Sequence, residues 1–259
     1  MGDEGTMIEP DPFTPGGFTV TSAGIPQSHV NPADPRHLAF EYVRRIGHVI
    51  DLLAEVGRPI TALHLGGGGL TLPRYIAATR PGSVQTVVEL DRELTERVLG
   101  RMPLPAGADI RFIFDDAMAA VRRLATGTTG TVRTAGTAQL VVVDVYDGLV
   151  PPPYIADPGF LRELVGLLAP EGVVAVNVAD GPSLERTRAQ GRALGVAIPQ
   201  LAALGTPRVL AGEEAGNVVL LGSSATTFVD WLPRLGALGP HPSETLSGAE
   251  LAAVLDQFG

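Results

Sequence analysis

The stretch 61–71 reads TALHLGGGGLT and decides the fold of this 259-residue chain. A short apolar run ends in four consecutive glycines, 66–69, and a helical pattern follows over about 70–80. Glycines between a strand and a helix permit a tight turn and let a ligand approach bare backbone. The N-terminus of the following helix adds partial positive charge. The motif alone is weakly specific, and a purely structural glycine turn stays open as the alternative.

Further apolar runs follow this motif and alternate with helical stretches. They are rich in Val, Leu and Ile without strict polar alternation, which is typical of strands covered by helices on both faces. The pattern predicts an α/β fold with a mostly parallel, seven-stranded sheet. The strands are expected at 61–66, 84–90, 110–114, 138–145, 172–178, about 198–211 and 216–224, and the helices at 70–80, 91–100, 116–125, 158–169 and 182–194.

Composition and hydrophobic spacing predict how the chain is divided into segments. Residues 1–17 are rich in Gly, Pro and acid, which predicts a flexible tail. A β-hairpin is expected at 18–30, and apolar residues at helical spacing predict a helix between it and Gly57, so that 18–57 forms an N-terminal hairpin and helix. The α/β domain spans 58–225, and a C-terminal helical extension spans 226–259.

The residue types that are absent exclude several mechanisms. The chain has no cysteine and no lysine, since all 19 basic residues are arginine. Disulfides, thiolate nucleophiles, Schiff-base lysines and a Walker-type phosphate loop are therefore excluded. The five histidines lack metal-ligand spacing, so no metal is expected.

Net charge and hydropathy limit the classes of binding partner and the cellular locations that the sequence favours. A formal net charge of −9 disfavours nucleic-acid binding and favours a cationic small molecule. No apolar run reaches the length of a membrane span, and the acidic start lacks the features of a secretory signal. A cytoplasmic location is the expectation.

Acidic side chains follow the predicted strands at the edge where parallel sheets bind ligands. Glu89, about 20 residues after the glycines, is placed to bind the two hydroxyls of a ribose, while Asp91 reads as a helix N-cap. Asp115 and Asp116 follow the third strand. One of them could accept from an exocyclic amine such as that of adenine, and the other could cap the next helix.

The fourth strand ends in DVYDG, with Asp144 and Asp147. Two carboxylates at a strand end suit general-base work or the binding of an ammonium group, although loop polarity alone is the alternative. A proline-stiffened loop follows, and we expect Tyr146 and Tyr154 to act as substrate or lid residues. Because these strand ends carry acid and no basic cluster, a nucleoside bearing a sulfonium with a cationic acceptor fits better than a dinucleotide.

The order of these motifs resembles the spermidine synthase (polyamine aminopropyltransferase) family. The resemblance covers roughly residues 18–224 and rests on GGGG, VVELD, DDA and VVDVYDG. Through GIPQSHV, AFEYVRRIGHV, LHLGGGG, ATRPGS and GNVVL it is closest to an actinobacterial spermidine-synthase-like branch. It implies a class I methyltransferase-like Rossmann fold behind a small β-rich N-terminal part, and self-association as a homodimer.

The resemblance also implies residue roles. The nucleoside thioether would contact the glycine turn, the ribose would bind the acid after the second strand, and Asp144 would be the catalytic aspartate that prepares the attacking amine, with Asp147 as its neighbour. The implied cofactor-binding residues are Gln27, Gly66, Gly67, Gly68, Glu89, Asp116 and Ala117.

Three motifs depart from the family pattern. The family's GGGDG motif has an aspartate that holds the amino group of the aminopropyl chain, and this chain has Gly69 there. The family's YHE motif reads AFE at 39–41, and its DSSDP motif reads DVYDG.

We therefore expect a transferase that binds S-adenosylmethionine or its decarboxylated form and moves an aminopropyl group to a small-molecule amine. A methyltransferase that uses intact S-adenosylmethionine is the first alternative, and a non-catalytic nucleoside-binding protein is the second.

Overall fold

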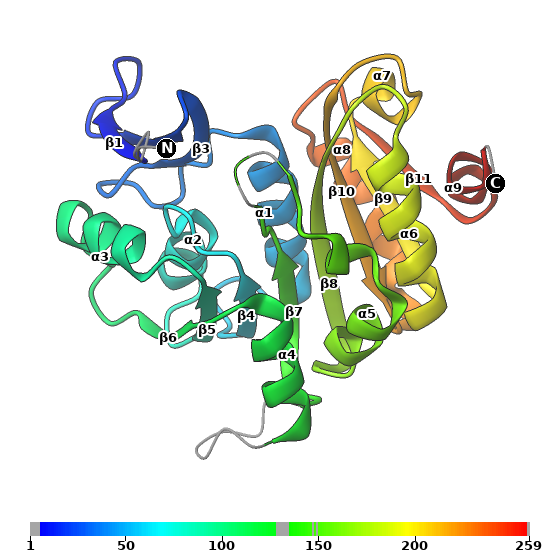
Figure 1. Ribbon diagram of the computed structural model, residues 1–259, viewed down its shortest axis with the longest axis horizontal. Helices are drawn as coiled ribbons and strands as arrows, with labels where there is room; N and C mark the ends of the chain where they lie inside the picture. The colour runs from blue at the N-terminus through cyan, green and yellow to red at the C-terminus, as the bar shows by residue number, and fades with distance from the viewer. Residues whose placement is uncertain (1–5, 128–134, 147, 149, 258–259) are drawn as a thin grey trace.

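The computed structural model describes residues 6–127, 135–146, 148 and 150–257. Within them, eight strands form one mixed sheet in the order β11-β9-β10-β8-β7-β4-β5-β6 (Figure 1). Strands β6, β5, β4, β7 and β8 are parallel, and β10 lies antiparallel between β8 and β9. The strands are β4 (Thr61–Leu65), β5 (Val84–Glu89), β6 (Asp109–Phe114), β7 (Ala138–Val143), β8 (Leu168–Asp180), β9 (Gln200–Gly205), β10 (Gly216–Ser223) and β11 (Glu244–Ser247).

The prediction of an α/β fold with a mostly parallel sheet is confirmed, and each of the seven predicted strands is present. The predicted strand number is wrong by one, because β11 from the C-terminal stretch pairs antiparallel with β9 at the sheet edge. The C-terminal extension is therefore a helix–strand–helix unit rather than helical throughout. The run 244–247 reads ETLS and is short and mostly polar, so it carries no strand periodicity.

Helices cover both faces of the sheet, which explains why the strands do not alternate in polarity. Leu63 and Leu65 of β4 belong to one buried cluster, with α4, α5 and α6, whereas Ala62 belongs to the cluster on the opposite face, with α1 and α2. The helices are α1 (Glu41–Leu53), α2 (Thr71–Thr79), α3 (Arg92–Arg101), α4 (Ala117–Thr126), α5 (Pro158–Val165), α6 (Glu185–Ala197), α7 (Pro207–Leu210), α8 (Leu232–Leu238) and α9 (Gly248–Asp256), with single 3-10 turns η1 (Pro153–Ala156) and η2 (Thr226–Trp231).

A separate antiparallel sheet of β1 (Met7–Pro10), β2 (Phe18–Ser22) and β3 (Ile25–Val30) precedes α1. The predicted hairpin is β2–β3. Strand β1 lies inside the stretch 1–17 that was expected to be a tail, and Asp11 beyond it is hydrogen-bonded to the buried His29 of β3, with 2.8 Å between Oδ2 and Nε2. A third buried cluster, which includes Val30 and Leu70, packs this sheet against the start of α2.

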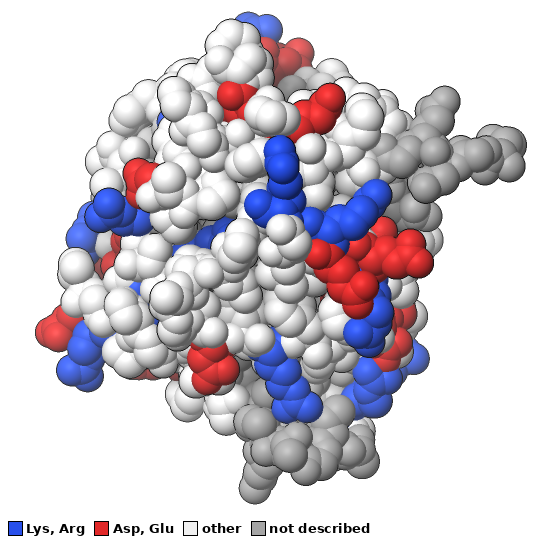
Figure 2. Space-filling model, turned by 90° about the vertical axis from the view of Figure 1, so that its left-hand side faces the viewer, with Lys and Arg blue, Asp and Glu red and all other residues white. Residues whose placement is uncertain are grey.

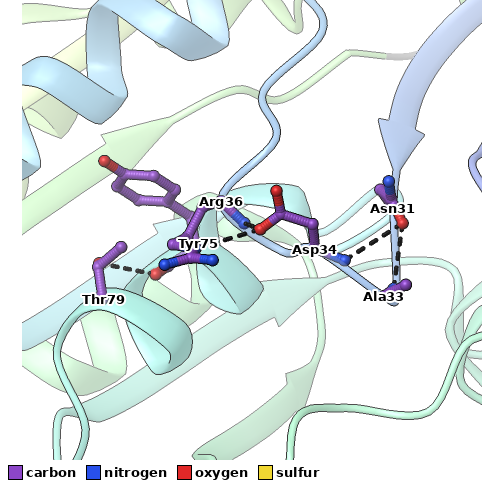
Figure 3. A network of polar contacts seen from close by, with 6 residues as sticks. All are labelled: Asn31, Ala33, Asp34, Arg36, Tyr75 and Thr79. Atoms are coloured by element: carbon purple, nitrogen blue, oxygen red, sulfur yellow. Dashed lines mark hydrogen bonds and ion pairs between the residues drawn. The ribbon is translucent and has the colours of Figure 1, made fainter. Parts of the chain in front are cut away.

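The connection from β3 to α1 is fixed by short-range polar contacts (Figure 3). The side-chain oxygen of Asn31 accepts from the backbone N–H groups of Ala33 and Asp34 at 3.1 and 3.2 Å. Asp34 in turn accepts from the backbone and the side chain of Arg36. These turns direct the chain from the small sheet to the first helix of the large one.

The surface carries both signs of charge. On the face turned toward the viewer in Figure 2, arginine and acidic side chains both occur across the surface. None of the helices in the described part of the chain is long and apolar enough to cross a membrane.

Candidate active site at the glycine turn

The glycine turn joins β4 to α2 and presses against the end of β7. Gly66 has φ +90°, and a Cβ there would lie 2.1 Å from the carbonyl oxygen of Asp144. Gly68 has φ +48°, and the buried Leu70 adopts the same left-handed region as it starts the helix. Only glycine can occupy position 66 without moving the β7 backbone, so the turn places Asp144 beside the bare backbone.

Glu89, the last residue of β5, faces this turn. Its Oε2 accepts from the N–H of Gly67 at 2.8 Å and from that of Gly68 at 3.4 Å, and its Oε1 accepts from the N–H of Asp91 at 2.9 Å. A carboxylate oxygen has two lone pairs, so Oε1, which accepts one hydrogen bond, retains acceptor capacity. Glu89 thus stabilises the turn by hydrogen bonds and can still accept a hydrogen bond from a hydroxyl group at Oε1.

Strand β3 occupies the space next to Gly69. The Ser28 hydroxyl accepts from the Gly69 N–H at 3.0 Å. A Cβ on Gly69 would lie 2.9 Å from both Ser28 Cβ and Val30 Cγ2, closer than real Cβ atoms approach. An aspartate at position 69, where the family motif has one, would therefore require Ser28 and Val30 to shift.

Asp144 lies just beyond β7 and is half-buried. Its Oδ2 accepts from the Tyr42 hydroxyl of α1 at 3.1 Å, and its Oδ1 accepts from the Asn177 side-chain amide of β8 at 2.8 Å. Burial raises the pKa of the Asp144 carboxyl, although both hydrogen bonds act in the opposite direction. The carboxylate is accordingly a stronger base than an exposed aspartate.

A cavity of about 30 Å³ lies between the glycine turn and Asp144. That is room for a water molecule or an amine nitrogen, and too little for a nucleoside. In the described residues that line it, Asp144 is the one acidic group. The lining residues are Ser28, Tyr42, Val43, His64, Gly66, Gly67, Thr71, Leu72, Pro73, Val142 and Asp144.

His64 of β4 also lines this cavity but is a core residue, as the sequence predicted. It is 2% exposed, and its Nε2 lies 3.0 Å from Oε1 of Gln85. Burial lowers the pKa of the His64 imidazole to about 4. His64 is therefore uncharged at neutral pH and adds no positive charge to the cavity.

Asp116 and Tyr154, expected at adenine and in a lid, contact each other. Asp116 Oδ1 accepts from the N–H of Ala119 as the N-cap of α4, and its Oδ2 accepts from the Tyr154 hydroxyl at 3.1 Å. Burial and the neighbouring carboxylate raise the pKa of Tyr154 to about 12. The proline-rich loop is thus fastened to the start of α4, where Ala117 is buried in the core.

Other sequence-predicted residues lie elsewhere. The Tyr146 hydroxyl donates to the Asn177 carbonyl at 2.9 Å and accepts from the Ala179 N–H at 2.7 Å, so it secures the end of β8. Gln27 has no partner in the β2–β3 register and donates to the carbonyl of Ile25, whereas its neighbour Ser28 contacts the turn. Asp147 lies outside the described residues.

The sequence reasoning missed three residues around Asp144. Tyr42 falls among the apolar positions that predict the first helix, so its hydroxyl does not stand out in the sequence. Asn177 is the single polar residue in the run GVVAVNV, which could have marked it. Asn217 of β10 donates to Asn177 Oδ1 at 3.0 Å, a contact for which the sequence held no signal.

No family model and no curated protein matches the sequence. Solved structures do. A probable spermidine synthase from Corynebacterium glutamicum is 24% identical over 97% of this chain and 90% of its own, with a TM-score of 0.84. Human methyltransferase-like protein 13, in complex with SAH, is 22% identical over 77% of this chain and 91% of its own, with a TM-score of 0.59. The spermidine synthase from Thermotoga maritima is 17% identical over 80% of this chain and 66% of its own, with a TM-score of 0.58.

These likenesses establish the fold. The chain has the methyltransferase-like Rossmann fold, and its resemblance to spermidine synthases is confirmed at the level of the fold.

Proposed function

We propose that this chain is a transferase that binds S-adenosylmethionine or decarboxylated S-adenosylmethionine and moves an aminopropyl group to a small-molecule amine. The observation that carries the proposal is the half-buried Asp144 carboxylate, held at the end of β7 against the bare backbone of Gly66. The fold shared with spermidine synthases supports it.

The donor would lie along the glycine turn. Its ribose would bind Glu89 through Oε1, which has a lone pair free, and its adenine would lie toward Asp116 and Ala117. The 30 Å³ cavity would receive only the attacking nitrogen. The sulfonium of the donor is drawn to a site whose lining carries a carboxylate and no cation.

In the transfer, the lone pair of a neutral amine nitrogen attacks the donor carbon next to sulfur. The C–N bond forms, the C–S bond breaks, and the bonding electron pair returns to sulfur, which becomes a neutral thioether. Before the attack, the substrate ammonium loses a proton to Asp144, and this leaves the nitrogen neutral with its lone pair free. Because an amine has a pKa near 10.4, a proton acceptor is required, and burial raises the pKa of Asp144 in the direction that strengthens it as a base.

The Asp144→Asn variant tests this role. It keeps the shape and loses the base, so we expect turnover with decarboxylated S-adenosylmethionine and a diamine to fall by about 10²-fold or more, with methylthioadenosine affinity nearly unchanged. Asp109→Asn, which alters an exposed acid at the start of β6, is the matched control and should keep its rate. An undiminished rate in Asp144→Asn would remove Asp144 from the mechanism.

Methyl transfer from intact S-adenosylmethionine is the second candidate, and one observation favours it. Position 69 has no carboxylate to hold the free amine of the decarboxylated donor, and a Cβ there would crowd Ser28 and Val30. Calorimetry with the two donors and methylthioadenosine separates the candidates. Binding of the decarboxylated donor alone supports aminopropyl transfer, preference for S-adenosylmethionine supports methyl transfer, and no binding of any of the three contradicts both. Self-association as a homodimer remains a prediction.

A further inference from the structure

Asp144 stands at one end of a row of side chains that crosses three strands. The Asn217 side-chain amide of β10 donates to Asn177 Oδ1 of β8 at 3.0 Å, and the Asn177 amide donates to Asp144 Oδ1 at 2.8 Å. Asn177 pairs with Val219 and Asn217 pairs with Ala179, so the two asparagines are diagonal neighbours on one face of the antiparallel pair. The chain has three asparagines in all, and two of them form this row.

We propose that Asn177 and Asn217 are positioning residues that hold the Asp144 carboxylate in its ionised form and in a fixed direction. The inference deepens the proposed function and rests on it only for the role of Asp144 as proton acceptor.

The argument begins with the chemistry of an amide. Asn177 has one end that accepts and one end that donates, whereas an ionised carboxylate only accepts. Only the Nδ2 end of Asn177 can therefore face ionised Asp144. Asn177 is 6% exposed, so water does not readily satisfy the end that points away.

Asn217 satisfies the end of Asn177 that points away from Asp144. Its donated hydrogen bond satisfies Asn177 Oδ1 on the far side. Without that bond the buried Oδ1 would lack a donor whenever Nδ2 faces ionised Asp144, so the ionised form would lose its fully satisfied arrangement. Asn217 thereby favours the ionised carboxylate without touching it.

The other groups that face Asp144 do not supply the same control. Tyr42 of α1 donates to Oδ2, the opposite oxygen, and burial together with the charge of Asp144 raises the pKa of its hydroxyl. His64 of β4 is buried and uncharged, and the Tyr146 hydroxyl is engaged by the β8 backbone. Among these described neighbours, Asn177 alone has an amide whose direction depends on a further partner.

The test is a carboxyl ¹³C NMR titration of the full-length protein, with the Asp144 signal assigned by Asp144→Asn. Asn217→Leu keeps the approximate shape of the side chain and removes the donor. We expect it to move the Asp144 midpoint upward by about one pH unit, and Asn177→Leu to move it further. Asn31→Leu makes the same chemical change away from the row and should leave the midpoint in place. An unmoved midpoint in folded Asn217→Leu would overturn the proposal.

The wild-type protein gives a measurement that needs no variant. The side-chain amide signals of Asn177 and Asn217 should both shift with the midpoint of Asp144, while that of Asn31 should not. If the two signals titrate independently of Asp144, the proposed coupling of Asn177 and Asn217 to Asp144 is wrong.

Turnover separates this inference from the proposed function. If the wild-type protein transfers aminopropyl groups, the acid limb of its kcat/KM profile should move upward with the NMR midpoint in Asn217→Leu. If the NMR results hold and no donor supports turnover, the proposed function fails and the positioning role stands. If turnover occurs and its acid limb ignores Asn217, the positioning role fails and the function stands.

Discussion

Burial affects two titratable side chains of one cavity in opposite directions. It raises the pKa of the Asp144 carboxyl and lowers that of the His64 imidazole to about 4. Both shifts favour the uncharged form, because a low-dielectric site penalises charge of either sign. The consequences differ, since Asp144 becomes a better base while His64 loses the ability to carry charge at neutral pH.

The His64 shift predicts a pH dependence of stability. The folded-state pKa of about 4 lies below the ordinary value of 6.5, so the unfolded chain binds a proton first as the pH falls. The His64 contribution is complete above pH 6.5 and is lost between 6.5 and about 4, which amounts to about 3 kcal/mol. The difference in unfolding free energy between wild type and His64→Gln, measured by urea titration at several pH values, should shrink by that order over this window. A difference that does not vary with pH contradicts the prediction.

Three aspartates have a structural role as helix N-caps. Asp91, Asp116 and Asp157 each accept a hydrogen bond from the backbone N–H three residues later, at the starts of α3, α4 and α5. Buried arginines donate hydrogen bonds to backbone carbonyl groups at helix C-termini. The Arg80 guanidinium donates to four backbone carbonyls around the end of α1, and Arg74 joins the Gly69 carbonyl to Met102 and Pro103 after α3. These contacts satisfy groups that a helix end would otherwise leave unpaired.

The α3 cap predicts a stability change without a binding change. Asp91→Ala should lower the unfolding free energy by about 1 kcal/mol, and Asp91→Ser should retain most of it because the hydroxyl can accept from Leu94. Methylthioadenosine affinity, measured by calorimetry, should be the same in both variants. Equal destabilisation by alanine and serine would show that the cap contributes nothing.

At the scale of the molecule, the two sheets meet at the glycine turn. The contact between the two sheets is made by Gly69, which packs against Ser28 and Val30. Asp11 and His29 fix the outer strands of the small sheet, and Thr71 of α2 donates to the His29 carbonyl at 2.9 Å. The ligand edge of the large sheet is therefore closed on one side by the N-terminal sheet.

Matched glycine substitutions test this contact. Gly69→Ala adds one methyl group against Ser28 and Val30 and should destabilise the protein by about 1–3 kcal/mol. Gly100→Ala makes the same change in open space on α3 and should stabilise it by up to about 1 kcal/mol. Urea unfolding gives both values. Hydrogen exchange in Gly69→Ala should rise in β2 and β3, and unchanged exchange there with unchanged stability contradicts the docking.

The sequence by itself determined the α/β class, the seven central strands, the glycine turn and the acids at the strand ends, because burial on both faces and strand ends leave local patterns of apolar and polar residues. It also predicted Asp91 as a cap and His64 as a core residue. The tertiary structure alone decided what surrounds Asp144. Tyr42, Asn177 and Asn217 come from α1, β8 and β10, and their convergence depends on strand order and register across the sheet. Strand β11 likewise arises from pairing with the distant strand β9, which a reading of neighbouring residues cannot detect, and β1 forms by pairing with β2.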